Sequence, residues 1–183
     1  MKTSSELKNL QKTLLDALKS KGALSFEDGK TASLSSPCSL KKCVVVVCFG
    51  TPNVPGDAFG PIVADSLREI CEVPVFVYGT SENPITAKNM VEKLDFVSTV
   101  HKDDLIISVD ASLGDVVGGV AVRKDGVCPA AVKGRKKRFG DVGILGIVAK
   151  PSEDALVSLM TADFLLVERL AKNVANAISE AIA

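Results

Sequence analysis

One segment constrains the fold more than any other: the run of four valines and a cysteine at Val44–Cys48. β-Branched residues favour strands. An unbroken apolar run, as opposed to an alternating one, is typical of a strand that is buried on both faces. Strands of that kind belong to parallel sheets with helices packed on both sides. The chain is therefore expected to contain a parallel sheet between helical layers.

The remainder of the chain alternates strands with helices. The predicted strands are Val75–Tyr78, 105–109, 119–122 and 143–149, and the predicted helices run from Pro61 to about Cys71, from residues 84–86 to about Phe96, and from Ser152 onward with a break near residues 161–163. This alternation is typical of βαβ units. Residues 119–122 are expected to form half of a hairpin that turns at residues 124–126. We predict an α/β/α sandwich of about five strands with the order 2-1-3 at its centre.

The N-terminal segment is predicted to be an amphipathic helix from about Ser4 to Lys21. Its leucines follow helical spacing: Leu7, Leu10, Leu14, Leu15 and Leu18. Residues 23–42 are polar and rich in serine, which indicates a connector. The predicted organisation is an N-terminal helix with its connector over residues 1–42 and a single domain over residues 43–183. The segment could be removable, or the helix could dock on the domain.

Charge and hydropathy limit the class of partner. Lys+Arg and Asp+Glu both number 22, so the chain has no net charge that indicates binding to nucleic acid or to a membrane. No apolar run approaches the roughly 20 residues that span a bilayer. The N-terminus also lacks the apolar stretch of a signal peptide. We expect a soluble, cytoplasmic protein with no nucleic-acid or membrane partner.

The cysteines and the single histidine are expected to have structural roles. An odd number of cysteines, five, without a Cys-x-x-Cys pair argues against a disulfide framework or a zinc site. Cys48 and Cys71 are interpreted as small buried hydrophobic residues. His101 is expected to be a solvated surface residue at the amino-terminal edge of the sheet. That position excludes a Ser-His-Asp triad and weakens a metal site built on imidazole.

Two aspartates follow apolar strands. Asp57 lies in the loop after Val44–Cys48, and Asp110 comes directly after residues 105–109. Chemistry in parallel α/β sheets collects at the carboxyl ends of the strands, so the predicted strand order brings the two carboxylates to face each other across a crevice. Each could instead finish a strand: Asp57 as a turn residue, and Asp110 as a cap that binds the N–H groups of Ser112 and Gly114.

A close pair of carboxylates has its own chemistry. The two groups resist double ionisation, so one holds a proton at a pH where a lone aspartate would not. Such a pair can activate a water and protonate a leaving amine, as in aspartic peptidases. With a divalent ion between them, the same groups could polarise a carbonyl. The loop of residues 50–61 has three glycines and three prolines but carries neither the dinucleotide nor the P-loop fingerprint.

Two further segments have open interpretations. Residues 78–84 follow the second strand and could line the crevice, or could form a loop that ends in a helix cap. The basic run of residues 133–138 could be a solvated loop, or could hold an acidic partner or a substrate carboxylate. With only Phe139 beside it, this run is a poor stacking platform for nucleic acid.

Four ordered segments carry a family resemblance. They are Gly50-Thr51 with Gly56-Asp57-Ala58-Phe59-Gly60-Pro61, Val77-Tyr78-Gly79-Thr80 with Asn83-Pro84, Asp110-Ala111-Ser112-Leu113-Gly114, and residues 140–148. In this order they resemble the YyaC family of sporulation proteins. That family is similar to the spore germination protease and, more distantly, to hydrogenase maturation endopeptidases. The resemblance implies a three-layer α/β/α fold with a mixed, mostly parallel sheet, phosphorylase/hydrolase-like.

The resemblance also implies a site. Asp57 and Asp110 match the two proposed catalytic aspartates of the germination protease, in its Asp-Ala-Leu-Gly-Pro and Ile-Asp-Ala motifs. The residues expected to shape a substrate crevice are Gly56, Gly60, Thr80, Asn83 and Gly114. Hydrogenase maturation endopeptidases bind a metal through similar acidic positions plus a histidine, and this chain has no histidine at a matching place. The prediction is therefore a peptidase or amidase without metal or cofactor.

The expected partner is a peptide or protein substrate, and a homo-oligomer is compatible with the sequence. A sporulation protein of this kind would act in the cytoplasm, including the forespore or the spore interior. The alternative is a non-enzymatic binding or regulatory protein on the same fold. One departure from the family concerns specificity, because Ala130-Ala131-Val132 and the basic run replace a glycine-rich stretch before the last motif.

Overall fold

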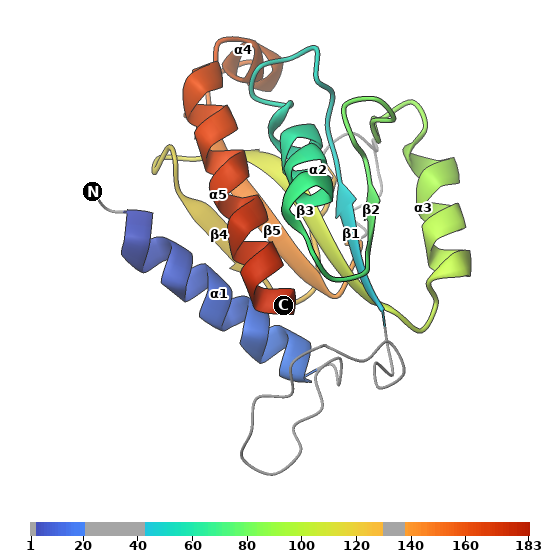
Figure 1. Ribbon diagram of the computed structural model, residues 1–183. Helices are drawn as coiled ribbons and strands as arrows, with labels where there is room; N and C mark the ends of the chain where they lie inside the picture. The colour runs from blue at the N-terminus through green and yellow to red at the C-terminus, as the bar shows by residue number, and fades with distance from the viewer. Residues whose placement is uncertain (1–2, 21–42, 130–137) are drawn as a thin grey trace.

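The computed structural model describes residues 3–20, 43–129 and 138–183. Strands and helices alternate along most of this chain (Figure 1). The elements are α1 (Thr3–Ser20), β1 (Val44–Cys48), α2 (Phe59–Ile70), β2 (Val75–Tyr78), α3 (Met90–Val100), β3 (Leu105–Leu113), β4 (Val120–Arg123), β5 (Val142–Ala149), α4 (Ala155–Met160) and α5 (Phe164–Ile182). The alternation confirms the predicted α/β class.

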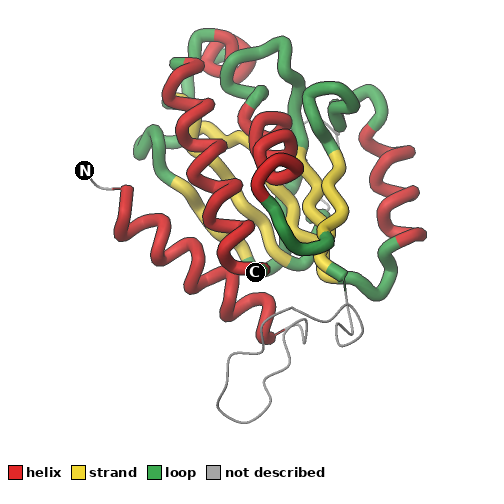
Figure 2. The backbone as a smooth tube through the Cα atoms, viewed as in Figure 1, coloured by secondary structure: helices red, strands yellow, loops and turns green. Residues whose placement is uncertain are grey.

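The five strands form one mixed sheet in the order β2-β1-β3-β5-β4 (Figure 2). The first four strands are parallel, and β4 pairs with β5 in the antiparallel direction. The predicted central order 2-1-3 is confirmed, and so is the predicted hairpin partner at residues 119–122. The chain runs from β1 out to β2 through α2 and then crosses back over β1 to β3 through α3. This switch in strand order leaves the carboxyl end of β1 open for a site.

The sheet lies between helices. One face of β1 contributes Val44, Val46 and Cys48 to the larger hydrophobic core, which also contains the buried sides of α2 and α5. The other face of β1 contributes Val45 and Val47 to a smaller core with Met90 and Val97 of α3. Alternate residues of one strand therefore serve two cores, as a strand buried on both faces requires.

The N-terminal helix α1 packs on the domain beside α5 (Figure 1). Leu10 and Leu14, four residues apart on one face of the helix, are buried in the larger core. The same helix lies against β4, at one edge of the sheet. None of the described helices combines the length and apolar character that are needed to cross a bilayer.

Two elements differ most from their predicted limits. Strand β3 continues past Val109 to Leu113 because β5 pairs with it as far as the Leu113–Ala149 pair. Helix α3 begins only at Met90, since the preceding segment is held in an extended turn: Ile85 forms a bridge with Phe49, and the Asn89 side chain accepts the Thr86 N–H at 2.9 Å. The sequence pattern could not anticipate these partners.

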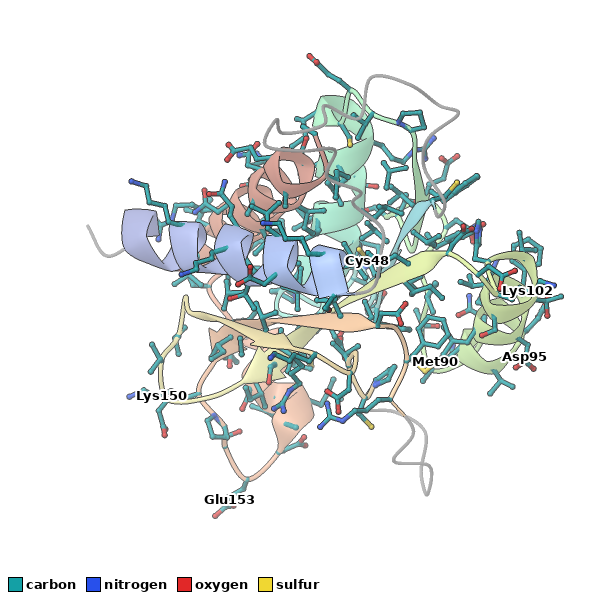
Figure 3. All side chains as sticks on the ribbon, turned by 90° about the horizontal axis from the view of Figure 1, so that it is seen from below. Cys48, Met90, Asp95, Lys102, Lys150 and Glu153 are labelled. Atoms are coloured by element: carbon teal, nitrogen blue, oxygen red, sulfur yellow. The ribbon has the colours of Figure 1, made fainter. Side chains whose placement is uncertain are left out.

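The described cysteines fit the expected structural role. Cys43, Cys48, Cys71 and Cys128 are free thiols. Cys48 is fully buried, and Figure 3 shows it in the interior, whereas Lys150 and Glu153 lie at the periphery. Cys71 is partly buried and packs against the larger core. The prediction of a small buried hydrophobic residue is confirmed for Cys48, whereas Cys71 is buried only in part.

Candidate active site at the carboxyl ends of β1 and β3

Asp110 lies within β3, not after it, which corrects its predicted position at a strand end. Its register partner in β5 is Leu145, and the preceding residue, Val109, pairs with Cys48 at the end of β1. The Asp110 carboxylate accepts the Ala111 N–H at 2.9 Å. The N–H of Gly114 donates to the carbonyl of Ala149 at 2.9 Å, so Gly114 extends the sheet and is not capped by Asp110.

The environment of Asp110 favours its protonated form. The residue is only 8% exposed. Burial raises the pKa of its carboxyl to about 7, and the negative charge of Asp57 contributes to the rise, while the Ala111 N–H opposes it. A carboxyl with this pKa exchanges its proton at neutral pH, which is a property of general acids and bases.

Asp57 is held in the loop between β1 and α2. Its carboxylate accepts the N–H of Thr51 at 2.8 Å. Burial raises the pKa of Asp57, and the Thr51 hydrogen bond opposes the rise. Gly50 has φ +127°, and a Cβ there would lie 2.0 Å from the Asp57 carbonyl oxygen and 3.3 Å from its carboxyl carbon. Gly50 is therefore required for the loop to close over β1 with Asp57 in this position.

The two other glycines of this loop contact protein atoms. The N–H of Gly56 donates to the carbonyl of Leu159 at 2.8 Å, which ties the loop to α4. A Cβ at Gly60 would lie 2.0 Å from the carbonyl oxygen of Phe49, so α2 can start this close to β1 only with glycine there. Both residues, predicted to shape a crevice, hold the Asp57 loop against the fold.

A third carboxylate, not selected from the sequence, lies near the pair. Asp65 of α2 accepts the N–H of Ser81 at 3.1 Å and so links α2 to the loop after β2. The buried thiol of Cys48 lies among these groups: burial raises its pKa, and the charges of Asp65 and Asp110 raise it further. No local pattern marks Asp65 in the sequence, because its hydrogen-bond partner lies in the loop after β2.

Thr80 and Asn83 lie together in the loop after β2, at a cavity that neither aspartate lines. Thr80 is buried, and its hydroxyl accepts the N–H of Asn83 at 3.2 Å. Both residues line a cavity of about 870 Å³ along β2. Its other lining residues include Leu67, Arg68, Val75, Val77, Tyr78, Glu82, Ile85 and Lys93, but neither Asp57 nor Asp110. The structure therefore places the predicted site residues in two adjoining regions.

His101 is buried, which shows that its prediction as a solvated surface residue is wrong. It is 3% exposed, and its ring lies 4.7 Å from that of Phe76. Both ring nitrogens are engaged, Nε2 with the Tyr78 hydroxyl at 2.9 Å and Nδ1 with Asp104 at 2.8 Å. The histidine caps the end of α3, and the packing of Phe76 and Tyr78 over it removes it from solvent.

A metal centre of the kind found in hydrogenase maturation endopeptidases does not fit these residues. The histidine is committed to Tyr78 and Asp104 and cannot supply an imidazole beside Asp57. Within residues 3–20, 43–129 and 138–183, no group of three His, Cys, Asp or Glu side chains is arranged to hold a metal ion.

Of the basic run, only Arg138 is within the described residues, and residues 133–137 lie outside them. Arg138 forms an ion pair with Asp125 at 3.0 Å and donates to the carbonyl of Gly126 at 3.2 Å. Its guanidinium stabilises the turn after β4.

Among solved structures, the chain is similar to the [NiFe] hydrogenase maturation protease HycI from Thermococcus kodakarensis KOD1, with a TM-score of 0.47, 20% identity, and coverage of 77% of this chain and 92% of HycI. It is also 38% identical over 110 residues to the uncharacterized protein YyaC of Bacillus subtilis (strain 168). That match covers 58% of this chain and 54% of YyaC, so the chain spans about half the length of this relative.

The predicted resemblance to YyaC is thereby confirmed. The family model described as "Protein of unknown function (DUF1256)" matches residues 24–177, which is most of the chain and includes both aspartates. The chain belongs to this family.

Proposed function

We propose that the protein hydrolyses peptide or amide bonds and that Asp57 and Asp110 are its acid/base pair. One observation supports this function above the others: Asp110 is buried, and its pKa is raised to about 7 beside the charge of Asp57. A structural carboxylate at a turn needs no such environment, whereas a general acid at neutral pH does. The resemblance to the YyaC family of sporulation proteins supports a role in sporulation, so we propose that the protein acts in the cytoplasm, the forespore or the spore.

The two carboxylates take different roles in this proposal. The charge of Asp57 raises the pKa of Asp110, so Asp57 ionises first and is the base. Asp57 takes a proton from a water molecule as the water oxygen bonds to the substrate carbonyl carbon. Asp110 donates its proton to the amide nitrogen as the C–N bond breaks. A proton passes from Asp57 back to Asp110 before the next cycle, so the protons balance.

The test is cleavage of a peptide library by three variants. Asp57→Asn and Asp110→Asn are each expected to lower the cleavage rate by about 100-fold or more, since general acid/base groups typically contribute that much. Asp103→Asn is the matched control because Asp103 is 83% exposed and lies at the opposite end of β3. Circular dichroism verifies that each variant is folded. Cleavage at the parental rate by both active-site variants contradicts the proposal.

A second function is favoured by the cavity along β2. Its lining excludes both aspartates, so it offers a binding surface that needs no catalysis. In this case the protein is a non-enzymatic binding or regulatory protein of sporulation. Asp57→Asn and Asp110→Asn would then leave sporulation intact in a complemented deletion strain, and substitutions in the cavity would impair it. The reverse pattern supports the hydrolase.

A further inference from the structure

The two edges of the sheet are treated differently. At one edge, β4 ends in the charged residue Arg123, and α1 lies against it. At the other edge, β2 has the sequence Val-Phe-Val-Tyr, without a charge, and pairs only with β1. Among the described residues, no other backbone hydrogen bond reaches Val75–Tyr78. Edge strands are usually blunted by charge, proline or a covering element, and an open apolar edge is a template for another strand.

The open edge of β2 is the floor of a groove. The cavity of about 870 Å³ runs along it, with Leu67 and Arg68 of α2 on one side and Lys93 of α3 on the other. The size is within the range of ligand sites in proteins. Phe76 is 49% exposed and Phe96 is 54% exposed, so apolar surface continues outside the groove on the α3 side. The floor thus offers main-chain hydrogen bonds, and the walls offer contacts for side chains.

The charged residues that line the groove favour an acidic ligand. Arg68 and Lys93 line it, and Glu82 is the one acidic residue of its lining. Within the described part of the chain, neither cation forms an ion pair or a hydrogen bond. Two partly exposed apolar side chains, Val75 and Val77, line the same groove. This combination suits an extended segment that alternates apolar with acidic side chains, because successive side chains of a strand point to opposite faces.

The groove ends beside the aspartates. Ile85 lines the carboxyl end of the groove, and its carbonyl accepts the N–H of Gly50 at 3.0 Å. Gly50 in turn abuts Asp57. The carboxyl end of the groove therefore adjoins the loop that holds Asp57.

We propose that an extended peptide segment, apolar at alternate positions and acidic between them, binds by adding a strand to β2. This mode of recognition takes affinity from main-chain hydrogen bonds and specificity from alternate side chains. The inference rests on the proposed function in one respect, that the bound segment is the substrate of Asp57 and Asp110. The binding itself does not require catalysis.

The first experiment uses fluorescein-labelled decapeptides that alternate valine with glutamate, and the Asp57→Asn/Asp110→Asn double variant, so that cleavage cannot interfere. Two N-methylated versions carry methyl groups on alternate residues, in opposite phase. Only one phase removes the N–H groups that face β2. Fluorescence anisotropy is expected to show about tenfold or greater loss of affinity for one phase and retention for the other. No binding of the parent peptide, or equal effects of both phases, overturns strand addition.

The second experiment changes the groove. The glutamates of a bound strand all lie on one of its faces, so they meet only one of the two cations. Arg68→Glu or Lys93→Glu, whichever cation lies on that face, is expected to weaken the binding of the valine–glutamate peptide by about tenfold and to leave the binding of a valine–lysine peptide undiminished. Lys124→Glu, an exposed residue next to the opposite edge of the sheet, is the matched control. If the three variants and the protein without these substitutions all bind the valine–glutamate peptide with equal affinity, the peptide does not bind in this groove.

The two proposals fail separately. If peptides are cleaved in an Asp57-dependent manner but the groove variants and N-methyl phases have no effect, the hydrolase stands and strand addition on β2 is wrong. If peptides bind as predicted and the parental protein cleaves none of them, the groove stands and the hydrolase is wrong.

Discussion

At the scale of single residues, the buried carboxyl of Asp110 should determine how stability varies with pH. Its pKa is about 7 in the folded chain and 3.8 without the fold. Between these values the folded state keeps a proton that the unfolded state has lost. The free energy of unfolding therefore falls as pH rises, by up to about 1.4 kcal/mol per pH unit. Below about pH 4 both states are protonated and this effect vanishes.

The measurement is urea unfolding at pH 4, 5 and 8 for the parental chain and for Asp110→Asn. We expect the variant to be more stable than the parent by about 2–4 kcal/mol at pH 8 and similar to it at pH 4. Asp103→Asn, the exposed control, should follow the parent. A parental stability that rises from pH 5 to pH 8 would show that Asp110 is ionised at little cost. Burial raises the pKa of Asp57 as well, which acts in the same direction.

Single residues also show which features of the site could be predicted from the sequence and which could not. Asp57 and Asp110 could be selected because each follows an apolar run in the sequence, which is a local pattern, although Asp110 itself lies within β3. The burial of His101 could not be predicted, because it depends on Phe76 and Tyr78 of β2, which are distant in the sequence. Asp65 was missed since its partner, the Ser81 N–H, lies 16 residues away in a loop. Local patterns were enough to select candidate residues. Their burial and hydrogen bonds depend on residues that are distant in the sequence.

At the scale of elements, α1 is part of the folded domain. Leu14 is fully buried in the core, although it lies ahead of the connector. Leu14→Ala is expected to lower the free energy of unfolding by about 2–5 kcal/mol, as for other buried leucines. Lys12→Ala, on the exposed side of the same helix, should change it by less than about 0.5 kcal/mol. Urea unfolding measures both, and a small effect of Leu14→Ala would show that α1 is not docked.

The limits of the elements were predictable where one segment determines them. Val44–Cys48 and Val75–Tyr78 were predicted to the residue because apolar runs with glycine or proline nearby are self-contained signals. The extension of β3 to Leu113 depends on pairing with β5, which is a tertiary contact. The late start of α3 depends on the bridge between Ile85 and Phe49. Both errors moved the boundary of an element and left its type unchanged.

At the scale of the whole molecule, the sheet order brings Asp57 and Asp110 close enough for the charge of one to raise the pKa of the other. The rate of the proposed reaction should therefore depend on pH. Hydrolysis needs Asp57 ionised and Asp110 protonated. The value of kcat/KM should therefore fall about tenfold per pH unit above pH 7, and should fall again at low pH as Asp57 takes up a proton. Initial rates between pH 4 and 9 on one cleaved peptide measure this profile. A rate that rises from pH 7 to pH 9 contradicts the assigned roles.

The buried thiol of Cys48 can report transient exposure of the carboxyl end of β1 to solvent. Its pKa is raised by burial and by Asp65 and Asp110, so in the closed protein it has neither access to alkylating reagents nor thiolate to react with them. Cys43 and Cys128 are exposed and would be alkylated at once. Slow labelling of Cys48 by iodoacetamide, measured by mass spectrometry, then reports how often the carboxyl end of β1 becomes exposed to solvent. No engineered label is needed.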